Sequence, residues 1–215
     1  MREHFDQELK DINQAVLHMS IMVEESLYKA KTALLEQNIP LAQQVIDEDA
    51  RVNEKEMEIS DQAAILIAKQ QPVAADLRHL IAVLKVVTDI ERIGDFAVHI
   101  AKRAREFGHD KPVKAYIDIP RMIDLGAQML REGVLAFIEK NEEKARAVSR
   151  VDEEVDALQK QVYRELLSLM MEDRETIKKA TKIMFLSRYL ERMGDHAVSI
   201  CEWAIYSATG RHEDL

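Results

Sequence analysis

Apolar side chains recur along this chain at steps of three and four residues, which is the spacing of one face of an α-helix. In one such stretch Leu77, Leu80, Leu84 and Val87 form a continuous apolar stripe. The same periodicity covers nearly the whole sequence, and no stretch shows the strict alternation of a half-buried β-strand. The pattern therefore predicts an all-α protein. Its six long helices are expected over residues 3–37, 39–70, 72–107, 118–140, 142–171 and 174–208.

Prolines and capping residues mark where these helices begin. Pro40 and Pro120 stand where the apolar periodicity restarts, and proline is tolerated in the first turn of a helix but not further in. Asparagine and aspartate cap helices because their side chains accept a hydrogen bond from a backbone N–H of the first turn. The predicted capping residues are Asn38, Asp118, Asn141 and Asp173.

The second half of the chain repeats the first. Residues 91–98 read Glu-Arg-Ile-Gly-Asp-Phe-Ala-Val, and residues 191–198 read Glu-Arg-Met-Gly-Asp-His-Ala-Val. Short connections make consecutive helices antiparallel neighbours. The duplication therefore predicts two similar three-helix bundles in tandem, over residues 1–108 and 109–215, with a linker at residues 108–117.

Both copies place acidic residues on an apolar stripe. Glu91 and Glu191 lie on the stripe, and an aspartate follows each of them one helical turn later. Burying a carboxylate is costly unless something compensates its charge. The preceding helix of each copy brings further oxygen-bearing side chains to the same level, because both sets lie about twenty residues from the turn at a rise of ~1.5 Å per residue. The two predicted clusters are Asp49, Asn53, Glu91 and Asp95 in the first half, and Asp152, Asp156, Glu191 and Asp195 in the second.

Clusters of oxygen ligands are typical of hard cations, so we expect Mg, Mn, Ca or iron, and no histidine or cysteine has the spacing of a zinc site. The alternative is an acidic surface paired with arginine and lysine from neighbouring helices. Asn53 is neutral where its counterpart Asp156 is acidic, so the first site is expected to bind fewer ions or to bind them less tightly. Gly94 and Gly194 weaken their helices. They predict either a close approach of helices or room for an ion.

Composition narrows the class of protein. A net charge of −9 argues against binding to nucleic acid. The single cysteine, Cys201, and a polar N-terminal segment without a signal peptide favour a cytoplasmic location. No apolar run approaches the ~20 residues that span a bilayer, so we expect contact with a membrane only through a partner.

The absence of a nucleophile elbow or a glycine-rich phosphate loop favours a protein that is not an enzyme. Two alternatives stay open. One is a carboxylate-bridged di-metal hydrolase or oxidase, although helical di-iron enzymes typically use Glu-x-x-His pairs, which both motifs lack. The other is a helical scaffold without metal.

The duplicated Glu-Arg-Ile/Met-Gly-Asp motif, together with Asp-Glu-Glu-Val-Asp at residues 152–156 and the run at residues 184–197, resembles the PhoU family of regulators of phosphate-specific transport. The resemblance extends along essentially the whole chain. It implies two similar helical bundles with metal sites at the acids named above. It also implies a cytoplasmic negative regulator of phosphate transport and of the phosphate-starvation response. The implied partners are the ATPase of the phosphate ABC transporter, a sensor histidine kinase and a second copy in a homodimer.

Overall fold

The fold is all-α over the part of the chain that the computed structural model describes, residues 2–108 and 118–215, and these residues form no strand. The all-α prediction is confirmed, with most helix ends within two or three residues of the expected positions. The predicted linker lies outside the described residues except for Gly108. The helices are α1 (Arg2–Glu36), α2 (Ile39–Gln70), α3 (Ala74–Phe107), α4 (Ile119–Glu139), α5 (Glu142–Ser149), α6 (Asp152–Glu172) and α7 (Ile177–Thr209), with a short 3₁₀ turn, η2 (Arg174–Thr176), before α7.

Helix starts follow the predicted caps with one exception. Three of the four predicted side chains accept a hydrogen bond from a backbone N–H of the first turn, at 2.8–3.0 Å, namely Asn38, Asn141 and Asp173. The side chain of Asp118 makes no such bond. Its backbone carbonyl instead accepts from the amide of Met122 at 3.0 Å. The prediction of a side-chain cap is therefore wrong at Asp118.

The helix predicted over residues 142–171 is interrupted, so the prediction of one continuous helix there is wrong. The amide of Val151 donates to the carbonyl of Val148 at 3.0 Å, an i to i+3 bond that belongs to a tighter, 3₁₀-type turn. Arg150 and Val151 keep right-handed backbone angles, so the chain passes from α5 into α6 without an extended residue between them. The interruption makes Asp152 the first residue of α6.

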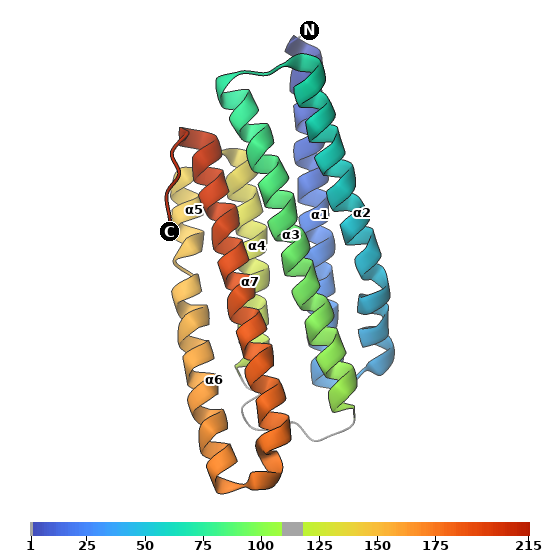
Figure 1. Ribbon diagram of the computed structural model, residues 1–215, viewed down its shortest axis with the longest axis vertical. Coiled ribbons are helices and arrows are strands. Elements are labelled where there is room, and N and C mark those ends of the chain that lie inside the picture. Colours follow the sequence, from blue (N-terminus) through green and yellow to red (C-terminus); the bar gives the residue numbers. More distant parts are fainter. Residues whose placement is uncertain (1, 109–117) are drawn as a thin grey trace.

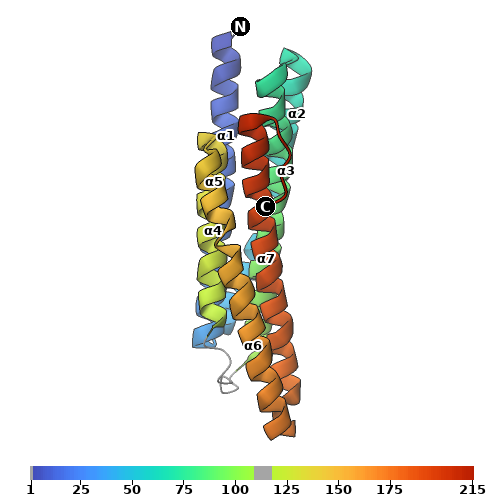
Figure 2. The same cartoon turned by 90° about the vertical axis from the view of Figure 1, so that its left-hand side faces the viewer.

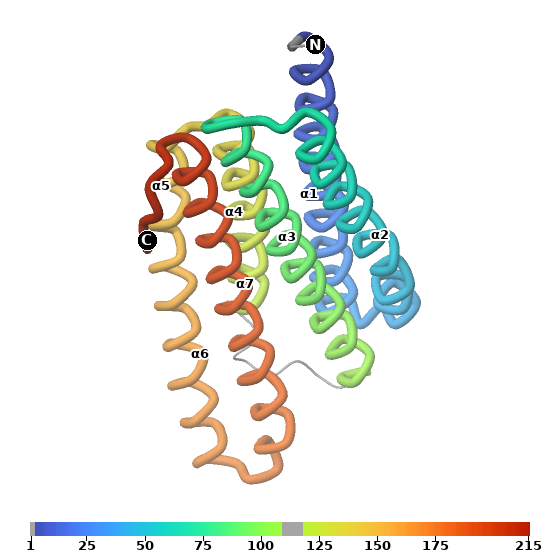
Figure 3. The backbone as a smooth tube through the Cα atoms, turned by 45° about the horizontal axis from the view of Figure 1, so that its top comes forward, coloured from blue at the N-terminus to red at the C-terminus, as the bar shows by residue number. Residues whose placement is uncertain are grey.

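The helices form two layers. One layer runs in the order α2, α3, α7, α6, and α1, α4 and α5 cover one side of it (Figures 1 and 2). α3 packs antiparallel to α7, and α1 packs antiparallel to α4, as the course of the chain in Figure 3 shows. The two halves are thus related by an approximate two-fold rotation, and one continuous apolar core joins them. No helix in the described ranges is both long enough and apolar enough to cross a bilayer.

The contact between α3 and α7 has different side chains at equivalent positions of the two halves. On one side of the axis the carboxylate of Asp89 accepts a hydrogen bond from the hydroxyl of Ser199 at 2.8 Å and meets Nδ1 of His196 at 2.9 Å. The residues at the equivalent positions on the other side are aromatic: Tyr189, His99 and Phe96. The rings of Tyr189 and His99 stack with 4.5 Å between their centroids. One backbone crossing therefore carries a polar contact on one side and an aromatic contact on the other.

A second polar network crosses the core at His79, whose side chain is fully buried. Its Nδ1 lies 2.8 Å from the hydroxyl of Ser207 on α7, and its Nε2 lies 2.8 Å from Oδ1 of Asn13 on α1. The ring also stacks on Phe137 of α4. Burial, and to a smaller extent the charge of Lys140, lower the pKa of His79 to about 4. One side chain thus connects four helices while it stays neutral.

The lowered pKa of His79 predicts a loss of stability in mild acid. A buried histidine of this kind favours folding only while it is neutral, so its contribution is complete above the unfolded-state pKa near 6.5 and is lost as the pH falls toward 4. The loss in the free energy of unfolding over this range is roughly 3 kcal/mol. Urea unfolding of a His79→Gln variant, which cannot titrate, should show a loss smaller by that amount. An equal loss in the free energy of unfolding for the wild-type protein and for His79→Gln would contradict the prediction. His4→Gln, at an exposed histidine, serves as the control.

Candidate metal centres

Three of the four residues predicted for the first cluster, Asp49, Glu91 and Asp95, lie close enough on α2 and α3 for their charges to act on one another. Burial raises the pKa of the Asp49 carboxyl, and the charge of Asp95 raises it further. Burial, and after it the charge of Asp95, likewise raise the pKa of Glu91. The oxygen of the Asn53 amide is buried and has no hydrogen-bond partner. Acids from adjacent antiparallel helices therefore act on one another as their spacing predicted.

Glu56 also belongs to the first cluster, although sequence reasoning left it out. Its charge helps to raise the pKa of Glu91. A usable signal was present, because Glu56 follows Val52 by four residues on the same stripe as Asp49. On the solvent side Arg92 pairs with Asp95, with 3.2 Å between Nη1 and Oδ2, and more loosely with Glu91. The first cluster is thus partly neutralised by Arg92 of the same helix, whereas the alternative of an acidic surface expected cations from neighbouring helices.

The second cluster lies between α6 and α7 and carries four carboxylates. Burial is the largest cause that raises the pKa of Asp152 to about 6, and the charges of Asp195, Asp156 and Glu191 add to it. Burial and the charge of Asp195 also raise the pKa of Glu191. The four predicted residues of this half therefore share one electrostatic environment. Since position 156 is Asp where position 53 is Asn, this half carries the denser set of mutually repelling acids.

Two carboxylate oxygens of the second cluster are buried without a partner, Oδ1 of Asp152 and Oε2 of Glu191. The other oxygen of Glu191 accepts from Arg188, and Asp156 pairs with Lys160 at 2.9 Å, so neighbouring cations satisfy only part of the cluster. A buried oxygen acceptor without a donor costs free energy, and the cost is larger when the group is charged. These two oxygens are therefore the strongest indication of a cation in this half.

The two motif glycines have different roles. A Cβ atom added at Gly194 would clash with Oδ1 of Asp152, so this glycine makes room for the carboxylate. A Cβ atom at Gly94 would meet only Val23 and Val52, each at 3.4 Å. The space at Gly194 is thus taken up by an acid of the neighbouring helix, and the expected room for an ion stays a prediction, while at Gly94 the neighbouring helices come to ordinary van der Waals distance.

The donor set fits a hard cation in the second cluster, because it offers several carboxylate oxygens of which two lack any partner. Across residues 2–108 and 118–215, no three acidic, histidine or cysteine side chains already converge as ligands of one ion. Binding thus requires the carboxylates to close by side-chain rotation. Both clusters lie between neighbours of the α2–α3–α7–α6 layer, and the other side of that layer is covered (Figure 2). They therefore open toward the same side of the molecule.

Comparison with known proteins places these features in a family of helical repeat proteins. The family model described as "PhoU domain" matches the chain twice, over residues 16–104 and 119–204. The chain belongs to the PhoU family. Each match spans one half of the molecule and includes one acid cluster.

The relatives match along nearly their full length. A Clostridium acetobutylicum protein named "Phosphate-specific transport system accessory protein PhoU homolog" is 35% identical over 100% of this chain and 98% of its own. The crystal structure of PhoU from Pseudomonas aeruginosa superposes with a TM-score of 0.91 at 35% identity, covering 96% of this chain and all of that one. A phosphate transport system regulatory protein PhoU from Streptococcus pneumoniae gives a TM-score of 0.90 at 29% identity, covering 98% and 100%.

The charge density of the second cluster predicts that Asp152→Asn stabilises the metal-free protein. A carboxyl whose folded-state pKa is raised opposes folding once it is ionised, so the penalty is full above pH 6 and disappears as the pH falls toward the unfolded value of 3.8. With allowance for solvent screening of this half-exposed group, the gain at pH 7.5 is about 1 kcal/mol. Urea unfolding in the presence of a chelator, from pH 5 to pH 8, measures it.

The exposed neighbour Glu153 supplies the matched control for this prediction. Glu153→Gln removes a charge from the same turn of α6 without touching the cluster, so it should bring no gain. A destabilised Asp152→Asn variant at pH 7.5 would show that the repulsion among these acids is not a cost to folding.

Proposed function

We propose that this chain is a negative regulator of phosphate transport and of the phosphate-starvation response, and that it acts as a metal-binding adaptor. The observation that carries the proposal is the match, along nearly whole chains, to proteins named as accessory and regulatory proteins of phosphate transport. Two acid clusters that open on one side of a single body support an adaptor, because they offer two related surfaces for contact with other proteins.

The proposed partners are the ATPase of the phosphate ABC transporter and a sensor histidine kinase, in the cytoplasm. The two halves have the same arrangement of helices but different side chains at equivalent positions, as the polar and aromatic sides of the α3–α7 contact illustrate. Similar but unequal surfaces suit a protein that contacts two different partners and relays the state of one to the other. The names of the relatives, accessory and regulatory protein, accord with a protein that is not an enzyme.

The proposed cofactors are cations bound by carboxylates, namely iron, Mn, Mg or Ca. When bound, such an ion supplies positive charge that neutralises the acids. Asp152 and Glu191 come from different helices, so ligands at their partnerless oxygens would tie α6 to α7. Arg188 and Lys160 already hold part of the cluster in place from the solvent side. The consequence is a fixed packing of the two helices whose outer surface the partners would meet.

Gly194→Ala should weaken cation binding while the chain still folds. The added methyl group displaces the flexible carboxylate of Asp152, and alanine favours the helix by up to ~1 kcal/mol over glycine. A cation at 100 times its dissociation constant adds about 2.7 kcal/mol to the stability of the wild-type protein. At this chain length the gain corresponds to a rise of roughly 5–10 °C in the unfolding temperature. In Gly194→Ala the rise measured with Mn²⁺ or Ca²⁺ should shrink by more than half.

Gly94→Ala is the matched control, because its new methyl group meets only two valines and no ligand. It should keep the full response to the cation. Elemental analysis of protein purified without a histidine tag provides the second measurement. An equal metal content and an equal thermal shift in both glycine variants would remove Asp152 from the proposed site.

A deletion strain tests the regulatory role itself. Phosphate-starvation genes should be expressed constitutively in rich phosphate when the chain is absent, and the wild-type chain should restore repression. Glu191→Gln combined with Asp195→Asn should fold but repress at least several-fold less, because it removes two of the four carboxylates. Failure of the wild-type chain to restore repression would refute the regulatory function. Full repression by the double variant would refute only the role of the metal.

A further inference from the structure

The contact between α3 and α7 holds a histidine that neither acid cluster uses. The two helices lie side by side in the layer that α1, α4 and α5 cover on one side only (Figures 1 and 2). His196 and Ser199 of α7 are partly exposed there, and both contact Asp89 of α3. Consecutive residues of a helix point about 100° apart. His196 therefore faces α3, while Asp195, the residue before it, belongs to the acid cluster beside α6.

Asp89 fixes the tautomer of the His196 ring. A carboxylate only accepts hydrogen bonds, so Nδ1 of His196, which lies 2.9 Å from Oδ1 of Asp89, carries a proton. In the neutral ring the free electron pair is then on Nε2, because one nitrogen of an imidazole is the donor and the other is the acceptor. The hydroxyl of Ser199 donates to the second oxygen of the same carboxylate at 2.8 Å and holds it in place. The ring is thus oriented with its nucleophilic nitrogen away from Asp89.

Nε2 of His196 is available for chemistry. It is not buried, it forms no hydrogen bond with any described residue, and the side chain is 25% exposed. The hydroxyl of Ser199 donates to Asp89 and not to the histidine, so the contact is not a serine hydrolase triad. No three acidic, histidine or cysteine side chains of residues 2–108 and 118–215 converge on one ion, so this nitrogen is no ready metal site either. The arrangement fits a histidine that reacts as a nucleophile.

Positive charge beside His196 selects the electrophile. Arg192 precedes it by four residues on α7, so the two are neighbours on one face of the helix. Arg192 is exposed and forms no ion pair with any described residue. Its charge also acts across the α3–α7 contact, because burial first of all lowers the pKa of His99 on α3, and the charges of Lys102 and Arg192 lower it further. A guanidinium with free N–H groups binds phosphate oxygens. The matching reactant therefore carries a phosphoryl group.

We propose that Nε2 of His196 accepts a phosphoryl group from a small acyl phosphate. The electron pair of Nε2 attacks the phosphorus atom, the bond between phosphorus and the acyl oxygen breaks, and its electrons leave with the carboxylate product. The ring keeps its proton on Nδ1 and gains one positive charge, which the carboxylate of Asp89 neutralises. Arg192 binds the phosphate oxygens. The inference goes beyond the proposed role in phosphate transport and does not depend on it, because it rests only on the α3–α7 contact.

Labelling of the full chain with radioactive acetyl phosphate tests the proposal. The label should appear on His196 of the wild-type protein, where mass spectrometry of its peptides at neutral pH locates it, and His196→Gln should lose it. A phosphorus–nitrogen bond at histidine breaks in acid and survives alkali, whereas a phosphorylated carboxylate is cleaved by alkali. Stability of the label in alkali therefore separates His196 from the acids of the two clusters. His99→Gln changes the other histidine of the α3–α7 contact and should leave the labelling unchanged.

Asp89 is a positioning residue in this proposal. An amide in its place can donate to Nδ1 as well as accept from it, so the proton can move to Nε2. Asp89→Asn should slow the labelling of His196 by roughly 10–100-fold. Asp89→Ala leaves Nδ1 without a partner, so phosphorus NMR should show a mixture of both ring positions, where the wild-type protein gives the Nε2 product alone. A merely structural role of Asp89 would not change the position of the label.

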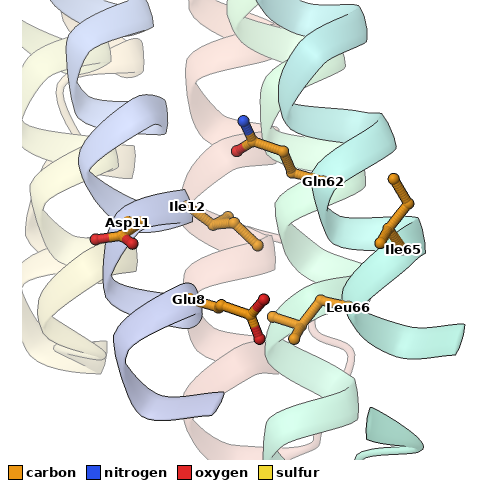
Figure 4. A pocket seen from close by; sticks show the side chains of 6 residues that line it. All are labelled: Glu8, Asp11, Ile12, Gln62, Ile65 and Leu66. Carbon is orange, nitrogen blue, oxygen red and sulfur yellow. The ribbon is translucent and has the colours of Figure 1, made fainter. Parts of the chain in front are cut away.

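His4 is a control within the same chain. Its Nδ1 lies 3.9 Å from Oε2 of Glu8, too far for a hydrogen bond, and the side chain of Glu8 points into the pocket between α1 and α2 (Figure 4). No carboxylate fixes the tautomer of His4, so this more exposed ring should take up roughly tenfold less label than His196. Absence of label, a label that alkali removes, or equal labelling of His4 and His196 would overturn the proposal. So would an unchanged rate in a folded Asp89→Asn variant.

Discussion

The antiparallel packing of α3 on α7 is the constraint on which the rest of this structure depends. It joins the two halves through one apolar core, so that neither half has to bury its inner surface alone. α3 and α7 form the centre of a layer that α1, α4 and α5 cover on one side, and the acids of both halves lie toward the other side. The carboxylates are thus held half-buried at the surface of a well-packed core, where their charge is costly without being fully enclosed.

Much of this arrangement could be predicted from the sequence because it follows from helix geometry. A constant rise per residue places Asp49 level with Asp95, and Asp152 level with Asp195, once the turns are located. The interruption at Arg150 and Val151 could not be predicted, since both are ordinary residues in a helix and the backbone there stays right-handed. The hydrogen-bond network around His79 could not be predicted either, because its partners lie on helices far away in the sequence.

The different surroundings of the two motif glycines could not be predicted for the same reason, because they depend on side chains of a neighbouring helix. Both follow Glu-Arg and an apolar residue and precede Asp, yet Gly194 faces a carboxylate and Gly94 faces two valines. The difference comes from the neighbouring helix, where α6 begins at Asp152 but α2 runs on without a break through Asp49. Duplication has kept the backbone of each copy while the side chains diverged. The extent of that divergence is seen where Asn53 corresponds to Asp156 and where Asp89 corresponds to Tyr189.

The shared core has a consequence for how this molecule meets other proteins. Because the two halves are not joined by a chain segment alone, the separation and the orientation of the two acid clusters are set by packed side chains. A partner that contacts both clusters would lose its rotational freedom once instead of twice, so its second contact would form at a high effective concentration. The fixed distance between the clusters would then favour partners whose two contact surfaces have the same spacing. A flexible connection between the halves would accept partners with many spacings.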